Sequence, residues 1–179
     1  MKKFLSLVAC AAMFFAFTGC GEDDDDTDAG QPTLTWTANP TFSTTEITPT
    51  MSVVITANVP NGIKGVSIKI ESPAQGFITA LNAIISVEAN KSTTTPVLDL
   101  INDPTVVAAL KLYGVPTGTD LKDKTSVTMD LSNMIPMVLG LNPEANTTHT
   151  FTLTLTDNKG HVFTKAVSFH YTGSTDKAS

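Results

Sequence analysis

Near its C-terminus the chain reads HTFTLTLTDNKGHVFTKAVSFHY, residues 149–171, and threonine occupies every second position from 150 to 156. Threonine at period two is typical of a strand, because β-branched side chains suit a pleated surface. The four residues DNKG, 157–160, match a three-residue hairpin loop in which Gly160 takes the left-handed conformation. The stretch therefore predicts two antiparallel strands joined by a tight turn.

The register of this hairpin follows from its loop. If residue 157 pairs with 161, cross-strand partners have residue numbers that sum to 318, and the side chains separate into two faces. The apolar face carries Phe151, Leu153, Leu155, Phe163, Val167 and Phe169. The polar face carries Thr150, Thr152, Thr154, Thr156, Thr164, Ser168 and His170. The exceptions are Lys165 on the apolar face and Val162 and Ala166 on the polar one, and a slip of one residue would mix the two faces.

Four more segments have the alternation of strands. In residues 33–38, Leu34 and Trp36 alternate with threonine, and similar patterns occur at 51–59, 63–72 and 125–131. The residues PNG at 60–62 predict a tight turn between two of these strands. Residues 39–50 are expected to form a loop.

A region of helical periodicity, about 74–118, interrupts the strands. Apolar residues at 77, 78, 81, 84 and 85 predict an amphipathic helix across about 74–86. Asp103 and Pro104 form an N-cap and first-turn signal, and Gly114 ends the helix that they begin. A further short helix is expected over 132–140.

These elements predict one mainly β domain over residues 33–172. The strands are short and alternating and show no βαβ rhythm, which favours an antiparallel β-sandwich with a small helical insertion at about 74–118. Residues 173–179 are expected to be a disordered tail.

Two parts of this domain resemble a known family. The closing THTFTLTLTDNKGHVFTKAVSFHY is similar to the last two strands of bacterial immunoglobulin-like domains. SIKIESPA, LYGVPTG and KTSVTMDLSNMIPMVL resemble an Ig-like domain of Bacteroidetes surface lipoproteins, which stands ahead of domains associated with carbohydrate metabolism. The resemblance covers roughly residues 63–172. It implies an Ig-like fold and a cell-surface location more than an activity.

The N-terminus has the pattern of a secretory signal peptide over residues 1–19. Lys2 and Lys3 precede the apolar run 4–17, and Gly19 provides a small residue before the cut. As a helix this run would reach about 21 Å, short of the roughly 30 Å hydrocarbon core, so a removed signal is favoured over a transmembrane anchor.

The next residue, Cys20, resembles the lipidated cysteine of bacterial lipoproteins. Thr18 and Gly19 suit that motif, whereas Phe17 stands where leucine is usual. The acidic run resembles the export signal of Bacteroidetes surface lipoproteins and comprises Glu22, Asp23, Asp24, Asp25 and Asp26. The resemblance implies a lipid anchor in the outer membrane, a charged flexible tether over 20–32 and a domain that faces the cell exterior.

Composition narrows the classes of partner. The formal net charge is −6, but without residues 1–28 the chain keeps 11 acidic and 9 basic residues, so most of the acidity lies in the tether. All 11 basic residues are lysine, which argues against nucleic acid as a partner. Of the two cysteines, Cys10 lies in the signal peptide, so a disulfide within the mature chain is not expected.

Few residues are candidates for catalysis or metal binding. His149, His161 and His170 are expected at the surface, and the hairpin register points His149 and His170 to opposite faces. Asp120 and Asp123, interleaved with lysines, predict a solvated loop, with calcium ligation as the less favoured alternative. Asp103 is already used as a helix N-cap. We therefore predict no enzyme, no catalytic residues, no metal site and no cofactor.

A binding role rests on a few residues. Trp36, Tyr113 and Tyr171 are the candidate ligand contacts, because sugar rings stack on exposed aromatics, although the phase of Trp36 with Leu34 favours the core. The apolar run 134–141, with its flexible Met134 and Met137, would either cap the sandwich or line a groove.

Two functions fit these observations. One is a non-catalytic surface lipoprotein accessory to glycan recognition or uptake. The other is a protein-interaction subunit of a cell-surface complex. Exposed, coplanar aromatic rings would favour the first, and an exposed apolar patch on the insertion would favour the second.

Overall fold

The computed structural model describes residues 30–84, 94–141 and 143–173. The hairpin predicted from the sequence forms the centre of its larger sheet. Strands β7 (Thr147–Asp157) and β8 (Val162–Tyr171) pair from Thr147 with Tyr171 to Thr156 with Val162, so the predicted register is confirmed. Gly160 has φ +89°, and its N–H donates to the Asp157 carbonyl. The left-handed turn residue is thus where the DNKG stretch predicted it.

The chain folds mainly into strands, arranged in two predominantly antiparallel sheets. The smaller sheet has the order β1-β3-β6, and the larger has the order β2-β8-β7-β4-β5. The remaining elements are β1 (Thr33–Trp36), β2 (Thr45–Glu46), β3 (Val54–Asn58), β4 (Ile63–Glu71), α1 (Gln75–Ile84), β5 (Val97–Asp99), α2 (Pro104–Lys111), η1 (Gly118–Asp120), β6 (Ser126–Asp130), η2 (Ser132–Met134) and α3 (Ile135–Gly140). This arrangement is consistent with the predicted β-sandwich.

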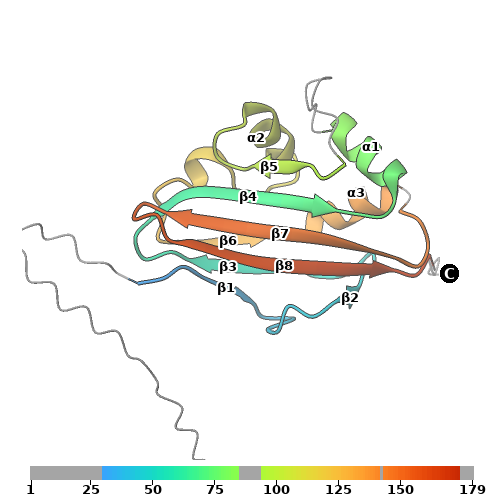
Figure 1. Ribbon diagram of the computed structural model, residues 1–179, viewed down its shortest axis with the longest axis horizontal. Coiled ribbons are helices and arrows are strands. Elements are labelled where there is room, and N and C mark those ends of the chain that lie inside the picture. Colours follow the sequence, from blue (N-terminus) through green and yellow to red (C-terminus); the bar gives the residue numbers. More distant parts are fainter. Residues whose placement is uncertain (1–29, 85–93, 142, 174–179) are drawn as a thin grey trace, which may run out of the picture.

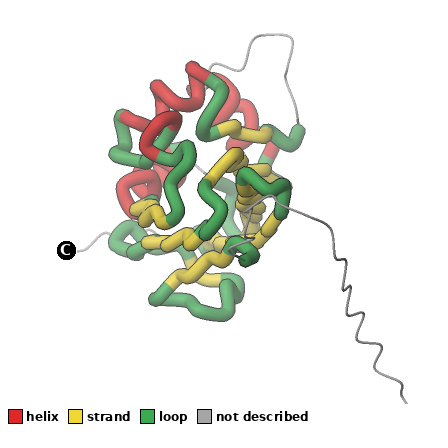
Figure 2. Tube along the Cα trace, turned by 90° about the vertical axis from the view of Figure 1, so that its left-hand side faces the viewer, coloured by secondary structure: helices red, strands yellow, loops and turns green. Residues whose placement is uncertain are grey.

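The helices gather on one side of the sheets. In Figure 1, α1 and α2 lie above β4 and α3 lies at the level of its right-hand end, whereas β1 and β2 run along the opposite side. Figure 2 shows the same separation after a quarter turn.

Asp103 caps α2 as predicted, since its Oδ1 accepts hydrogen bonds from the backbone N–H groups of Thr105 and Val106. Residues of all three α-helices join residues of both sheets in one hydrophobic core.

Three local predictions were wrong or incomplete. The turn at 60–62 does join two strands, but β3 and β4 belong to different sheets and do not pair. The predicted loop 39–50 contains β2, which pairs in parallel with β8. The insertion contains β5, which pairs with β4. Such short strands exist only where a longer neighbour supplies their hydrogen bonds, so local alternation does not reveal them.

The one charged exception on the hairpin's apolar face has a partner. Lys165 is half-buried, and its Nζ lies 5.0 Å from the centre of the Phe42 ring. A lysine stem packs along apolar surface while its ammonium group is attracted to an aromatic face. Lys165 therefore remains on the inner side of β8 without disrupting the register.

Candidate functional site

Trp36 lies in the core and not on the surface. Its side chain is 1% exposed, and its ring packs 6.0 Å from both Phe42 and Phe169. The core interpretation of this residue is confirmed. Its assignment as a ligand contact is wrong, because the inward phase of β1 aims the indole between the sheets.

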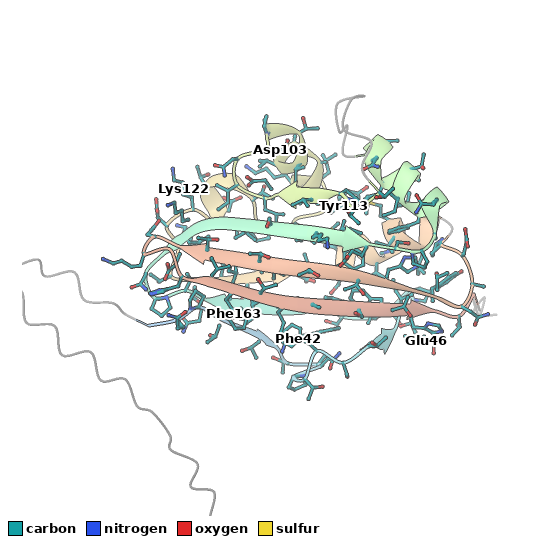
Figure 3. All side chains as sticks on the ribbon, viewed as in Figure 1. Phe42, Glu46, Asp103, Tyr113, Lys122 and Phe163 are labelled. Atoms are coloured by element: carbon teal, nitrogen blue, oxygen red, sulfur yellow. The ribbon has the colours of Figure 1, made fainter. Side chains whose placement is uncertain are left out.

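The two tyrosines do not form a platform with Trp36. Tyr113 follows α2 and is half-buried on the helical side of the molecule (Figure 3), whereas Tyr171 ends β8 and is also half-buried. Both pack against the core with part of each ring accessible. With Trp36 buried, the described structure does not assemble these three rings into a single stacking surface.

The other predicted site residues divide into two groups. Cys20 and the acidic run 22–26 lie outside the described residues, so their assignments stay predictions. Asp123 accepts a hydrogen bond from Asn158 Nδ2 at 3.1 Å, and Asp120 Oδ2 lies 4.0 Å from Lys111 Nζ. Within residues 30–84, 94–141 and 143–173, no group of three or more His, Cys, Asp or Glu side chains is placed to hold a metal.

The three histidines occupy separate environments. The prediction that each lies at the surface is wrong for His149, which is 2% exposed and stacks 4.8 Å from Phe77. His161 is next to the hairpin turn, where its Nδ1 donates to Asp157 Oδ2 at 2.8 Å. His170 is half-exposed and lies on the opposite face of the hairpin from His149, as the register predicted.

Hydrogen bonds fix which nitrogen of the neutral His149 ring carries the proton. Thr147 Oγ1 donates to the Glu144 carbonyl, so His149 Nε2 must donate to that hydroxyl, 2.9 Å away. Nδ1 then accepts from Ser72 Oγ at 2.8 Å, and Ser72 Oγ itself accepts from the Ala74 N–H. Burial, with a smaller contribution from the charge of His170, lowers the pKa of His149. The buried ring is therefore a neutral structural group.

Stability should consequently fall as the solution becomes acidic. The pKa of His149 is lowered in the folded protein from an ordinary value of 6.5, so the unfolded chain binds more protons once the pH drops below that value. We expect the free energy of unfolding contributed by this residue to be complete above pH 6.5 and to decline below it. Denaturant unfolding of the wild type and of His149→Gln between pH 7.5 and 5 measures this effect. An identical pH slope in the two proteins would contradict it.

A cavity of about 90 Å³ lies between the inner faces of the two sheets and beneath the helices. Both sheets and all three α-helices contribute to its wall. Apart from Tyr113, every lining side chain is a hydrocarbon or a thioether: Ile47, Val53, Ile55, Ile68, Ile70, Phe77, Leu81, Leu98, Ala109, Leu110, Val115, Met129, Leu131, Met134, Ile135, Met137, Val138, Phe151, Leu153, Val167 and Phe169. The site is therefore almost purely apolar.

Two residues that line the cavity are less buried than their neighbours on the same strands. Ile68 on β4 and Phe151 on β7 belong to the inward phases of central strands. Their strand neighbours of the same phase, such as Val66 and Leu155, are fully buried, yet Ile68 and Phe151 are only half-buried. Both residues line the cavity.

Several lining residues on the helical side are only half-buried. They are Ala109 in α2, Tyr113 after it, Leu131 and Met134 before α3, and Met137 within α3. Asn133 Nδ2 donates to the Tyr113 carbonyl at 3.4 Å and links the two segments. The run at 134–141, predicted either to cap the sandwich or to line a groove, contributes Met134, Ile135, Met137 and Val138 to the cavity wall.

A volume that the side chains leave unfilled has a cost in stability. At about 24 cal/mol per Å³, a volume of about 90 Å³ corresponds to on the order of 2 kcal/mol of lost packing free energy. Apolar cavities of this kind stay dry, because water finds no hydrogen-bond partner in them. Occupation by an apolar group would recover part of this packing energy.

Comparisons with protein-family models, with curated proteins and with solved structures found no match to this chain. In the part of the chain that the structure describes, no helix is both long enough and apolar enough to cross a membrane. The cavity and the helices that line it are the structural features that bear on function.

Proposed function

We propose that this chain is a non-catalytic binding module, an Ig-like β-sandwich held at the outer membrane by a lipid on Cys20 and facing the cell exterior. The observation that carries the binding role is the apolar cavity under the helical insertion, with half-buried Tyr113, Met134 and Met137 among its lining residues. A mostly apolar lining with few polar groups is typical of ligand sites, and the small volume limits the occupant to a small group.

The strand order supports the Ig-like part of this proposal. In Ig constant-type domains, strands A, B, E and D form one sheet and C, F and G the other. Here β1, β3 and β6 would correspond to A, B and E, and β4, β7 and β8 to C, F and G. The helical insertion between β4 and β6 takes the place of strand D.

The lipid anchor is tested by replacing Cys20. In cells that produce the protein, we expect Cys20→Ala to abolish labelling by an alkyne fatty acid and to release the protein from the membrane fraction. Cys10→Ala is the matched control, because Cys10 is the only other cysteine and lies within the expected signal peptide. Persistent labelling of the Cys20→Ala protein would exclude this anchor.

The outward orientation is tested through the acidic run. Replacing residues 23–26 with asparagine should reduce digestion of the protein by protease added to whole cells, if the acids direct export. Unchanged digestion would mean that the run acts only as a spacer.

A role accessory to glycan recognition is the second candidate. The outer face of β7 and β8 carries hydroxyl pairs, with Thr150 Oγ1 3.0 Å from Ser168 Oγ and Thr154 Oγ1 3.3 Å from Thr164 Oγ1. Such a surface offers donors and acceptors to sugar hydroxyls. Binding on a glycan array that is lost in Tyr171→Ala or Tyr113→Ala would favour this role. A blank array would direct the search to protein partners by crosslinking on intact cells.

A further inference from the structure

We propose that the cavity between the two sheets binds a short, uncharged alkyl chain, which enters between Tyr113 and the methionines of the 134–137 segment. This inference deepens the proposed binding role and rests on it. It does not depend on the lipid anchor or on the cellular location.

The chemistry of the wall excludes charged and strongly polar ligands. Every lining side chain except Tyr113 lacks a strong hydrogen-bonding group. A polar ligand atom placed there would lose its bonds to water without replacement, which is unfavourable in an apolar interior. A ligand can therefore place only hydrocarbon inside, with any polar end left at the half-buried Tyr113 opening.

The dimensions favour a chain over a ring. The volume of about 90 Å³ is below the roughly 150 Å³ of a comparably lined engineered cavity that binds benzene. The lining residues come from both sheets and from α1, α2 and α3, so a group inside the cavity would meet apolar side chains on all sides. An alkyl chain has a smaller cross-section than an aromatic ring and can place only a few carbon atoms in so small a volume.

The opening provides the adaptability that binding requires. Met134 and Met137 are unbranched and flexible, and methionine side chains adjust their shape around apolar groups. They are half-buried and belong to short segments, η2 and α3, at the edge of the core. These side chains can move aside without breaking a strand pairing.

The test is a titration of the purified protein with a homologous series of 1-alkanols from butanol to decanol, followed by calorimetry and by the methionine methyl resonances. Each methylene buried in the cavity should tighten binding about fourfold until the chain outgrows the space, after which affinity should level off. The methyl signals of Met129, Met134 and Met137 should shift, whereas Met51, which does not line the cavity, should stay constant.

A pair of variants on α2 distinguishes the cavity from other apolar surfaces. Ala109 lines the cavity, whereas Ala108 is exposed on the same helix. We expect Ala109→Leu to fill the cavity and weaken binding at least tenfold with an unchanged or higher melting temperature. We expect Ala108→Leu to bind within twofold of the wild type.

Three results would overturn the proposal. They are an affinity that does not depend on chain length, methyl shifts that include Met51 equally, and an equal loss of binding in the two alanine variants. The first two are measured on the wild type, so they decide the question even if Ala109→Leu fails to fold. Failure of alkanol binding with normal labelling of Cys20 would refute this inference and leave the surface location intact.

Discussion

Replacing Trp36 with alanine is expected to lower the free energy of unfolding by about 3–5 kcal/mol, as for other large buried aromatics. Trp36 is 1% exposed and packs edge-on against Phe42 and at a tilt against Phe169, so truncation leaves a cavity between β1 and β8 and removes both ring contacts. Equilibrium unfolding in urea measures the loss.

Two variants control for this effect. Thr35→Ala changes the neighbouring exposed residue of β1 and should alter stability by no more than about 0.5 kcal/mol. Trp36→Phe should cost less than Trp36→Ala, since the buried indole Nε1 has no hydrogen-bond partner among the described residues and its loss breaks no bond. A stable Trp36→Ala protein that had lost a ligand would instead return Trp36 to a binding surface.

Replacing Asp157 with asparagine is expected to lower the melting temperature by on the order of 10 °C at pH 7. The carboxylate is fully buried at the hairpin turn. Its Oδ2 accepts from Asn61 Nδ2 and His161 Nδ1, each at 2.8 Å, and its Oδ1 accepts from the N–H groups of Lys159 and His161. An asparagine NH2 in place of Oδ2 would face the donors of both Asn61 and His161, so both of these hydrogen bonds would be lost.

The loss should depend on pH. Burial by itself would raise the pKa of Asp157, but hydrogen bonds from Asn61 and His161, together with the charge of His161, lower it from 3.8 to about 2. The folded protein therefore holds this carboxyl ionised more strongly than the unfolded chain does. The resulting stability is complete above pH 3.8 and disappears as the pH falls toward 2.

Thermal unfolding at pH 7, 4, 3 and 2 tests both statements about Asp157. The difference between the wild type and Asp157→Asn should shrink below pH 4, because asparagine does not titrate. Asp120→Asn, on an exposed carboxylate, is the control and should have little effect at any pH. A difference that stays constant to pH 2, or that equals that of the control, would contradict the assigned network.

The distance along the chain over which contacts act explains which parts of the fold the sequence predicts. Gly160, Asp103 and the threonine alternation act on residues within a few positions of themselves, and the turn, the helix cap and the register that they predict are all present. By contrast, β2 and β5 depend on backbone partners far along the chain, in β8 and β4. Their own two and three residues hold too little pattern to identify them.

The candidate site was predictable only in part. Tyr113, Met134 and Met137 are candidates for ligand contact on the sequence alone, and they do line the cavity. Ile68 and Phe151 were not, because an inward-facing residue next to a void has the same local pattern as one in a filled core. His149 also lies in a run of threonines that looks polar, but Ser72, 77 positions away, helps to satisfy its ring inside the protein.

The sequence by itself determined the mainly β class, the final hairpin with its register and the helical interruption, because each follows from periodicity, turn residues and caps that act over short distances. Tertiary structure alone decided which strands share a sheet, which polar groups are buried and where the core is left unfilled. Those outcomes depend on how side chains from distant segments divide the space between two sheets, and packing of that kind leaves no periodic trace in the chain.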